Sequence, residues 1–197
     1  MKSRIRCAWP LAAWMIVWVA GGVSAAATPP SYALDATKSS LEFAFVQAGA
    51  QNKGRFPKFT VNFTFADEAL ADSKLDVTID VAALDTQDQE RDDTLRDTDL
   101  FDVKKYPQAR FTATQMTKTA GGYEATGTLL LRGVTKPQRV QFALRSASEQ
   151  GRHVLYMTGK SLVKRLDFGV GQGDWKSTEW VGNEVIITFN LRLIAAG

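Results

Sequence analysis

The sequence is poor in the side chains that perform most enzyme and metal chemistry. Its 197 residues include one cysteine, Cys7, and one histidine, His153. Zinc and haem sites of the usual kind need several such ligands, and a disulfide needs two cysteines. A Gly-x-Ser-x-Gly nucleophile motif is also absent. We therefore expect no catalytic residue, metal site or cofactor, and we interpret His153 as a structural residue of a strand.

The sequence also lacks an excess of charge once its first segment is set aside. The full chain has 24 basic and 21 acidic residues. Residues 1–25 contain three of the basic residues and none of the acidic ones, so the remainder carries 21 of each. Binding to nucleic acid or to an anionic membrane through charge needs a basic excess. Net charge supports neither partner, and we expect no nucleic-acid binding.

Residues 1–25 have the three parts of a secretory signal peptide: basic residues, an apolar stretch and small residues at a cleavage position. We predict cleavage after Ala25, with Ala27 as the second choice. The alternative is an uncleaved membrane anchor, but the apolar stretch is short for a span and is interrupted by Pro10. The mature chain is then one domain, residues 26–197, secreted without a cysteine.

Most of the remaining chain shows the period-two alternation of β-strands. Phe59, Val61, Phe63 and Phe65 occupy every second position of one short run, which gives a strand one apolar and one wet face. The strands that we predict span residues 32–34, 41–45, 56–65, 75–81, 111–117, 123–132, 139–144, 153–162 and 185–193. Turn-rich segments connect them at residues 49–54, 121–122 and 133–137. Consecutive hairpins predict an all-β antiparallel barrel of about eight strands.

One segment departs from this pattern and predicts a short, exposed helix. Residues 86–89 have the form of a capping box with Thr86 as the N-cap, and the helix continues to about Thr98. Asp92 and Arg96 are spaced to pair on its surface. The acidic residues here could suggest calcium, but their spacing does not match an EF-hand loop. We prefer a solvated helix face.

A glycine-rich segment at residues 169–173 resembles a phosphate-binding loop only superficially, because its spacing is wrong and no helix follows. We interpret it as a flexible loop at the rim of the barrel. Trp175 and Trp180 lie beside it. Two readings stay open, since these rings could cover the end of a ligand or simply pack the loop onto the barrel.

A barrel of about eight strands is either filled by its own side chains or holds one small ligand. If it is hollow, the apolar faces of the strands supply the lining. The candidate channel residues are Phe43, Phe45, Phe59, Val61, Phe63, Phe65, Val77, Ile79, Phe101, Phe111, Leu129, Leu131, Phe142 and Phe189. The candidate mouth residues are Arg55, Arg165 and Trp175.

Several motifs in the right order resemble the YceI family of periplasmic polyisoprenoid-binding proteins. The signature-like residues are Thr86, Arg91-Asp92, Leu95-Arg96, Asp99, Phe101-Asp102, Tyr106-Pro107 and Phe111. Further matching motifs are Tyr32-x-x-Asp35, Ser40-x-x-Phe43, Gly54-Arg55-Phe56, Leu131-x-Gly133-Val134-Thr135-Lys136-Pro137, Asp167-Phe168-Gly169 and Val181-Gly182-Asn183-Glu184-Val185. One departure is Gln47-Ala48-Gly49, where many relatives carry a histidine.

The resemblance implies an extended, lipocalin-like barrel with a helix near one end and a long apolar channel for an isoprenoid tail. It implies a periplasmic, non-enzymatic carrier whose ligand is a polyisoprenoid or another long-chain lipid, such as a prenyl quinone. A homodimer and a link to b-type membrane cytochromes are also implied. Two alternatives are an interaction protein with a structural or stress-related role and a filled core, and a lipid-modifying enzyme.

Overall fold

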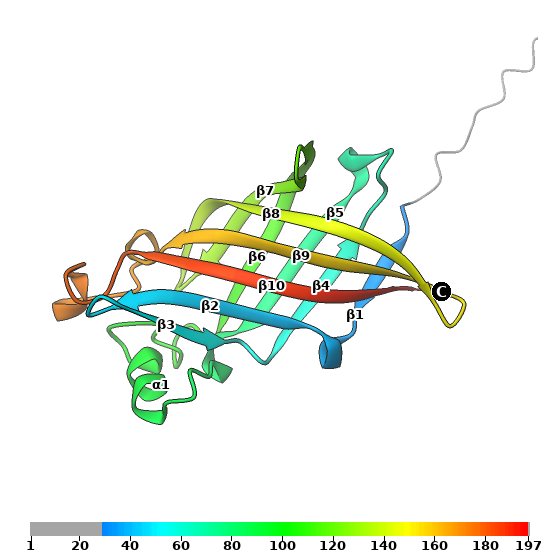
Figure 1. Cartoon of the computed structure of the whole chain (residues 1–197). Helices are drawn as coiled ribbons and strands as arrows, with labels where there is room; N and C mark the ends of the chain where they lie inside the picture. Colours follow the sequence, from blue (N-terminus) through cyan, green and yellow to red (C-terminus); the bar gives the residue numbers. More distant parts are fainter. Residues whose placement is uncertain (1–28, 197) are drawn as a thin grey trace, which may run out of the picture.

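The computed structural model describes residues 29–196, which form one antiparallel sheet of ten strands (Figure 1). The predicted signal peptide lies outside these residues. The strands are β1 (Ser31–Leu34), β2 (Ser40–Gln47), β3 (Ala50–Arg55), β4 (Phe59–Thr64), β5 (Lys74–Asp80), β6 (Gln108–Thr119), β7 (Gly122–Leu131), β8 (Val134–Glu149), β9 (Arg152–Lys164) and β10 (Glu184–Ala195).

Within residues 29–196 there is one α-helix, α1 (Gln89–Arg96), together with five short 3-10 turns. These turns are η1 (Ala36–Lys38), η2 (Leu70–Asp72), η3 (Val81–Ala83), η4 (Arg165–Phe168) and η5 (Gly173–Lys176). In this part of the chain, no helix has the length and apolar character needed to cross a bilayer.

Eight of the strands close into a ring, which confirms the predicted barrel. Its order is β1-β4-β5-β6-β7-β8-β9-β10, and β1 pairs with β10 to complete it. The other two strands extend the sheet. The same edge of β10 pairs with β1 through residues 193–195 and with β2 through residues 186–190, and β3 adds to β2.

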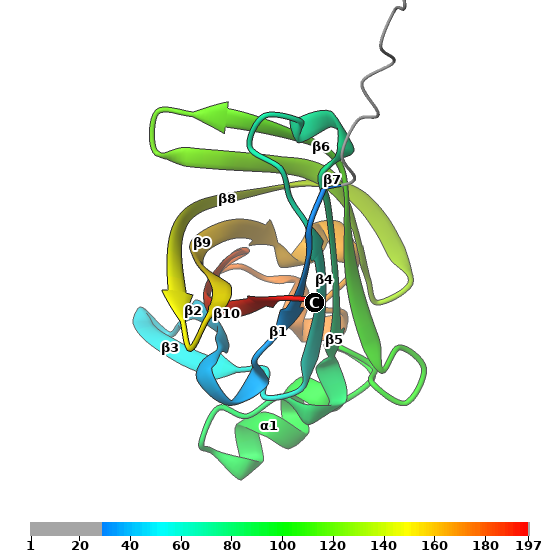
Figure 2. The same ribbon diagram turned by 90° about the vertical axis from the view of Figure 1, so that its right-hand side faces the viewer.

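This shared edge makes the two ends of the barrel different. At one end β1 connects β10 directly to β4. At the other end the β2–β3 hairpin replaces β1, and β3 does not pair with β4 or β5. A single bridge between Arg55 and Asp85 ties β3 to the chain beyond β5, and Figure 2 shows α1 below this part of the wall. The helix therefore lies where the strand ladder is incomplete.

Strand β3 and the first part of β8 were both predicted as turns. The turn before β3 is only Ala48-Gly49, with φ values of 50° and 77°. Because β3 is polar, with sequence AQNKGR, alternation gave no signal for it. The hairpin before β8 is likewise only Arg132-Gly133, and Pro137 lies inside β8 opposite Thr128. Pairing of β8 with β9 begins at Gln141, so the proline lies where that edge of β8 is unpaired.

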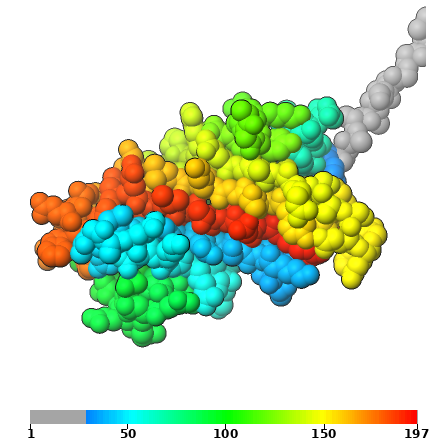
Figure 3. All heavy atoms as spheres, in the orientation of Figure 1, coloured from blue at the N-terminus to red at the C-terminus, as the bar shows by residue number. Residues whose placement is uncertain are grey.

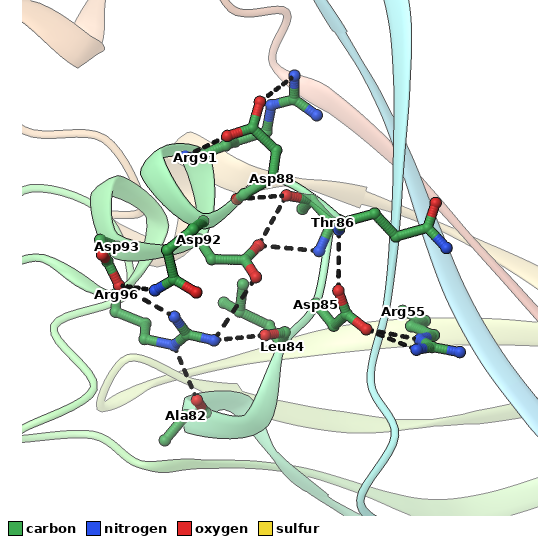
Figure 4. A network of polar contacts seen from close by, with 12 residues as sticks. Arg55, Ala82, Leu84, Asp85, Thr86, Asp88, Arg91, Asp92, Asp93 and Arg96 are labelled. Carbon is green, nitrogen blue, oxygen red and sulfur yellow. Dashed lines mark hydrogen bonds and ion pairs between the residues drawn. The ribbon is translucent and has the colours of Figure 1, made fainter.

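The helix is shorter than predicted and differently anchored. Asp88, not Thr86, is the N-cap, and its carboxylate accepts a hydrogen bond from the Arg91 N–H at 3.1 Å. The Thr86 N–H and hydroxyl both donate to the Asp92 carboxylate, at 2.8 and 2.7 Å (Figure 4). The predicted pair of Asp92 and Arg96 is present at 3.8 Å. We expected a solvated helix face, but the side chain of Asp92 is buried, so that expectation is wrong for this face.

The Arg96 side chain fixes the helix to the barrel. It donates hydrogen bonds to the carbonyl oxygens of Ala82 at 2.9 Å and Leu84 at 2.6 Å. Both acceptors belong to the segment that leaves β5, at η3. Figure 4 shows these contacts converging with Asp92 beneath the helix. Charge-assisted hydrogen bonds therefore hold the helix to this segment, while Leu95 of the helix packs against the core.

Aromatic rings fill the end of the barrel where β1 completes the ring. Phe63 of β4 and Phe65, which directly follows that strand, stack at 5.4 Å, and Phe142 of β8 meets Phe63 edge-on at 6.3 Å. Tyr123 stacks on Phe142 at 5.5 Å, and Tyr32 lies 6.0 Å from Phe63. Strands β4 and β8 are on opposite walls of the ring, so these side chains meet across its interior.

An ion-pair network supports the same end. The Arg192 guanidinium donates to Asp35 at 2.6 Å and to Glu149 at 2.7 Å. The Thr37 hydroxyl and Arg192 hold the pKa of Asp35 below its usual 3.8. The Tyr156 hydroxyl, followed by Arg192, lowers the pKa of Glu149 below 4.5. Folded-state pKa values below the unfolded ones stabilise the fold above pH 5 and lose that effect as the pH falls.

We therefore predict that Arg192→Met removes part of the acid sensitivity. Wild-type unfolding free energy should fall between about pH 5 and pH 3 as the two carboxylates become protonated. The variant should be less stable at pH 7 but should lose less on acidification, because its carboxylate pKa values lie closer to the unfolded values. Urea unfolding at both pH values measures this, with the exposed Arg139→Met as control. Parallel pH profiles for wild type and Arg192→Met would contradict the prediction.

Candidate functional site

An apolar cavity of about 580 Å³ lies inside the barrel, towards the end where the ring is incomplete. Side chains from β2, β4, β5, β6, β7, β8, β9 and β10 line it. Buried residues at its wall include Leu75, Ala109, Met157 and Leu191, in addition to phenylalanines. The interior is therefore divided between a filled aromatic end and an apolar space.

Eleven of the fourteen predicted channel residues line this cavity. They are Phe43, Phe45, Phe59, Val61, Val77, Ile79, Phe101, Phe111, Leu129, Leu131 and Phe189. Whether they bind a ligand stays a prediction. The other three, Phe63, Phe65 and Phe142, are buried but belong to the aromatic cluster instead. Alternation identifies the inward face of a strand, but it does not say how far along the barrel a side chain lies.

The cavity has further lining residues that were not predicted. Leu41, Leu75, Val185 and Ile187 follow the same alternation and could have been included. Others come from outside the strands, namely Phe56, Val81, Val170 and Val181. Val81 continues the alternation of Leu75, Val77 and Ile79. Only the tertiary fold brings the other three, Phe56, Val170 and Val181, to the cavity, since no periodic pattern marks them.

Polar side chains surround the place where the cavity reaches the surface. We call these residues the mouth: Gln47, Asp88, Glu90, Arg91 and Thr94. Asp88 and Glu90 are exposed while they line the cavity, so the opening lies beside the first half of α1. The Arg91 guanidinium is 3.3 Å from the Asp88 carboxylate (Figure 4). Counting Asp88, Glu90 and Arg91, the mouth has one net negative charge.

The three predicted mouth residues have different positions. Trp175 lines the cavity and is partly buried. Arg55 does not line it. Its guanidinium instead donates to the Asp85 carboxylate at 2.6 Å, beside the bridge that ties β3 to the chain beyond β5 (Figure 4). Arg165 lines the cavity but is 4% exposed, so it is a residue of the interior and not of the mouth.

Arg165 organises the segment that follows β9. Its guanidinium makes five hydrogen bonds, all to main-chain carbonyl oxygens, at distances between 2.7 and 3.1 Å. The acceptors are Val170, Trp175, Ser177, Val181 and Gly182. Burial lowers the pKa of this guanidinium below its ordinary value. The segment that we expected to be a flexible rim loop is therefore tied to a central cation.

Gly171 shows how closely this segment surrounds Arg165. Its φ is 112°, a conformation that favours glycine, and a Cβ there would lie 1.9 Å from a guanidinium nitrogen of Arg165. With all five donors used, Arg165 has no hydrogen bond left for a ligand. Its role in the site is to position the wall, including Trp175.

We predict that Arg165→Lys lowers the unfolding free energy by about 3 kcal/mol, because an ammonium group has three donors and leaves buried carbonyl oxygens without partners. Urea unfolding measures the change. Arg55→Lys is the matched control and should cost less than about 1 kcal/mol, since its ion pair is exposed. Equal costs for the two variants would show that the five bonds do not stabilise the segment.

A side-chain seam joins β8 and β9 at the cavity wall. The ladder between them ends at the pair Gln141 and Lys160. Beyond it, the Gln138 amide donates to the Ser161 hydroxyl and to the Leu162 carbonyl, both at 2.7 Å. Ser161 in turn donates to the Arg139 carbonyl at 2.7 Å. Gln138 and Ser161 both line the cavity, so this stretch of wall is held by side chains.

The fold also brings together a serine and the histidine. The Ser146 hydroxyl is 2.7 Å from His153 Nε2, and the Tyr32 hydroxyl is 3.1 Å from Nδ1. Sequence reasoning missed this pair because it depends on the register of β8 and β9. Neither Ser146 nor His153 lines the cavity. The pair therefore belongs to the opposite end of the barrel, beside the aromatic cluster.

Within residues 29–196, eight antiparallel strands close around an apolar cavity with a helix beside its mouth, which defines a lipocalin-like barrel. The family model of the YceI-like domain matches residues 32–193. The chain therefore belongs to the YceI-like family, as its motifs indicated.

Curated relatives match over part of their length. A UPF0312 protein of Photorhabdus laumondii is 48% identical over 84 residues, which are 43% of this chain and 44% of the relative. Protein YceI of Escherichia coli O157:H7 is 42% identical over 91 residues, 46% of this chain and 48% of the relative. The chain thus spans about half the length of these relatives.

Solved structures agree over more of the chain. BcnA of Burkholderia cenocepacia has a TM-score of 0.74 at 32% identity, covering 83% of this chain and 99% of that one. A Campylobacter jejuni YceI protein has a TM-score of 0.62 at 26% identity, covering 75% and 87%. A polyisoprenoid binding domain from Saccharophagus degradans has a TM-score of 0.60 at 20% identity, covering 85% and 99%. The last likeness concerns the fold alone.

Proposed function

We propose that this protein is a non-enzymatic carrier that holds a polyisoprenoid or a similar long-chain lipid in its barrel, with a prenyl quinone as one such ligand. The observation behind this proposal is the apolar cavity of about 580 Å³. Small-molecule sites typically have volumes of about 300–1,000 Å³ and mostly apolar walls. A neighbour of the same fold is described as a polyisoprenoid binding domain, which makes this lipid class the first to test.

Burial of the tail supplies the affinity in this proposal. Each five-carbon isoprene unit removed from water gains about 3–4 kcal/mol. Association and ordering offset several kcal/mol of that gain. Three or four buried units are then enough for useful affinity without a specific polar contact. The ligand is selected mainly by the length and shape of its tail.

The mouth sets a weaker preference for the head group. Arg165 has all its donors engaged with carbonyl oxygens, and Arg91 is paired with Asp88. Neither guanidinium is free to neutralise a phosphate, and the exposed Glu90 would repel one. An uncharged head group, such as that of a quinone, fits the charges at this mouth better than a phosphorylated one.

The cellular setting belongs to the same proposal. We place the protein in the periplasm, on the strength of the signal-like residues 1–25. A homodimer and an association with a b-type membrane cytochrome are implied by the family resemblance. A carrier of this kind would move a lipid between membranes or deliver it to a membrane partner.

The two alternatives have less support. The interaction protein with a structural or stress-related role requires a filled core, and the cavity argues against it. For a lipid-modifying enzyme, the Ser146–His153 pair is the chemistry that the fold brings together. Because the pair lies outside the cavity wall, a lipid tail in the cavity would not present a bond to it. Turnover of a bound prenyl compound is the measurement that would favour the enzyme.

Native mass spectrometry of the protein purified from a producing bacterium tests the carrier proposal. We expect a bound prenyl lipid, or uptake of an added prenyl quinone with one molecule per chain. Affinity should rise from one to three isoprene units and then level off as the cavity fills. Recovery of empty protein that takes up no prenyl quinone would overturn the proposal.

A cavity-filling substitution gives an independent prediction. Ala109 is buried on β6 and lines the cavity, so Ala109→Phe should weaken prenyl-quinone binding at least tenfold. The larger side chain should also lower the unfolding free energy by about 1–3 kcal/mol through overpacking. Ala143→Phe adds the same volume on the outer face of β8 and should bind normally. Quinone titration followed by intrinsic fluorescence measures both, after circular dichroism has shown that they are folded. Unchanged affinity in Ala109→Phe would place the ligand elsewhere.

A further inference from the structure

The outer wall of the barrel has an apolar patch beside the cavity. Within residues 29–196, five large apolar side chains are exposed, and four of them gather in one place. We call these four the outer patch: Val46 of β2, Leu162 of β9, Ile186 of β10 and Trp180 of the loop before β10. The fifth, Leu130, is on β7.

The pairing of the strands makes the outer patch contiguous. Ile186 lies opposite Leu162 on one side and opposite Ala44 on the other, next to Val46 on the same strand face. The Trp180 carbonyl accepts a hydrogen bond from the Ala48 N–H at 2.7 Å, which fixes its loop beside β2. Figure 3 shows this face, with β2, β10 and β9 side by side and the loop at one end. Trp180 is the most exposed member, at 69%.

The outer patch covers the same wall that lines the cavity. Every member has a chain neighbour in the lining: Gln47 next to Val46, Val163 next to Leu162, Val181 next to Trp180 and Ile187 next to Ile186. Since successive strand residues face opposite sides, one wall presents apolar side chains both inwards and outwards. Gln47 also belongs to the mouth, so the patch begins where the cavity opens.

We propose that the outer patch docks on the surface of a lipid bilayer and holds the mouth against it. This inference rests on the proposed function, because a polyisoprenoid is stored in bilayers and must reach the cavity from one. An exposed tryptophan beside half-exposed aliphatic side chains is typical of protein surfaces that bind at the membrane interface. A tail can then pass from the bilayer to the cavity without crossing much water.

The size of the patch favours a bilayer over a second protein molecule. Four partly exposed side chains present on the order of a few hundred Å² of apolar surface, whereas a stable protein interface buries about 800 Å² on each partner. A fluid bilayer needs no complementary shape. Insertion of one tryptophan and a few aliphatic side chains is enough for reversible binding.

Charges around the patch are nearly balanced. Lys53, Lys160 and Lys164 surround it, and none has an acidic partner within 4.0 Å in the part of the chain that the structure describes. Glu184 lies opposite Lys164 in the ladder, and Glu42 lies on the same outer face. Docking is therefore apolar in origin, so it tolerates salt and neutral lipids, in agreement with the absence of net charge in residues 26–197.

Vesicle flotation tests the docking. The protein is purified from the soluble fraction of a producing bacterium, and its N-terminal residue is determined by mass spectrometry. It is then mixed with neutral phosphatidylcholine–phosphatidylethanolamine vesicles. We expect the double variant Trp180→Ser/Ile186→Thr to lower the partition coefficient at least about tenfold. Leu130→Ser removes the exposed apolar side chain outside the patch and should change it by less than about twofold.

Four results would overturn the docking. One is a wild-type protein that does not float, and another is equal flotation of the double variant and wild type. The third is a patch substitution that changes the sedimentation coefficient but not flotation, since that would make the patch an interface between protein molecules. Binding only to anionic vesicles and only at low salt would also contradict it, because lysines and not the apolar side chains would then be responsible.

A transfer assay separates this inference from the proposed function. Vesicles containing an octaprenyl benzoquinone are the donor, and a water-soluble benzoquinone with two isoprene units reports on the cavity alone. The double variant should take up the octaprenyl compound at least tenfold more slowly and bind the short one normally. If wild type floats but takes up neither compound, the docking stands and the carrier function fails. If the double variant takes up the octaprenyl compound from vesicles at the wild-type rate, as the Leu130→Ser control should, the patch has no part in loading.

Discussion

The structure depends on one strand edge that serves two partners. One edge of β10 pairs with β1 along its last residues and with β2 along its first residues. Where β1 occupies the edge, the eight-stranded ring is complete, and aromatic rings from opposite walls fill it. Where β2 occupies the edge, the ring is interrupted, and the space between the walls is left for a cavity. The hollow and the filled halves follow from this single division of hydrogen bonds.

The polar residues near the cavity mainly hold the protein together. Arg96 donates to two carbonyl oxygens beneath α1, Asp92 accepts hydrogen bonds from Thr86, and Arg165 donates to five carbonyl oxygens at the cavity wall. Each group repairs backbone that cannot join a ladder where the strands end, which is the obligation of any buried carbonyl or amide. Little polar chemistry is then left for a ligand. An apolar interior, surrounded by charged side chains that already bind groups of the protein, is suited to retaining a molecule through the hydrophobic effect.

Much of the fold could be predicted from local pattern, and the parts that could not have identifiable reasons. Alternation located the strands around Val61 and Val77 because half-buried strands repeat every two residues. It failed for β3, whose sequence is polar on both faces, and it could not place Phe63 or Phe142 along the barrel axis. The N-cap was misassigned by two residues, since Thr86 and Asp88 both suit a cap and the choice was settled by the burial of Asp92. The buried position of Arg165 depends on five carbonyl oxygens that only the folded loop brings together.

The side-chain seam between β8 and β9 has a mechanical consequence. A main-chain ladder fixes the spacing of two strands, because each bond is part of a rigid and repetitive array. The bonds of Gln138 and Ser161 belong to rotatable side chains, each worth about 1 kcal/mol, so they can re-form at another separation. The barrel wall therefore lacks a main-chain ladder along this seam, as it does between β3 and β5, and the seam is the more easily stretched of its side-chain connections. In the carrier that we propose, the barrel can widen along this seam for a thicker tail and recover afterwards, so one sequence would accept tails of different thickness.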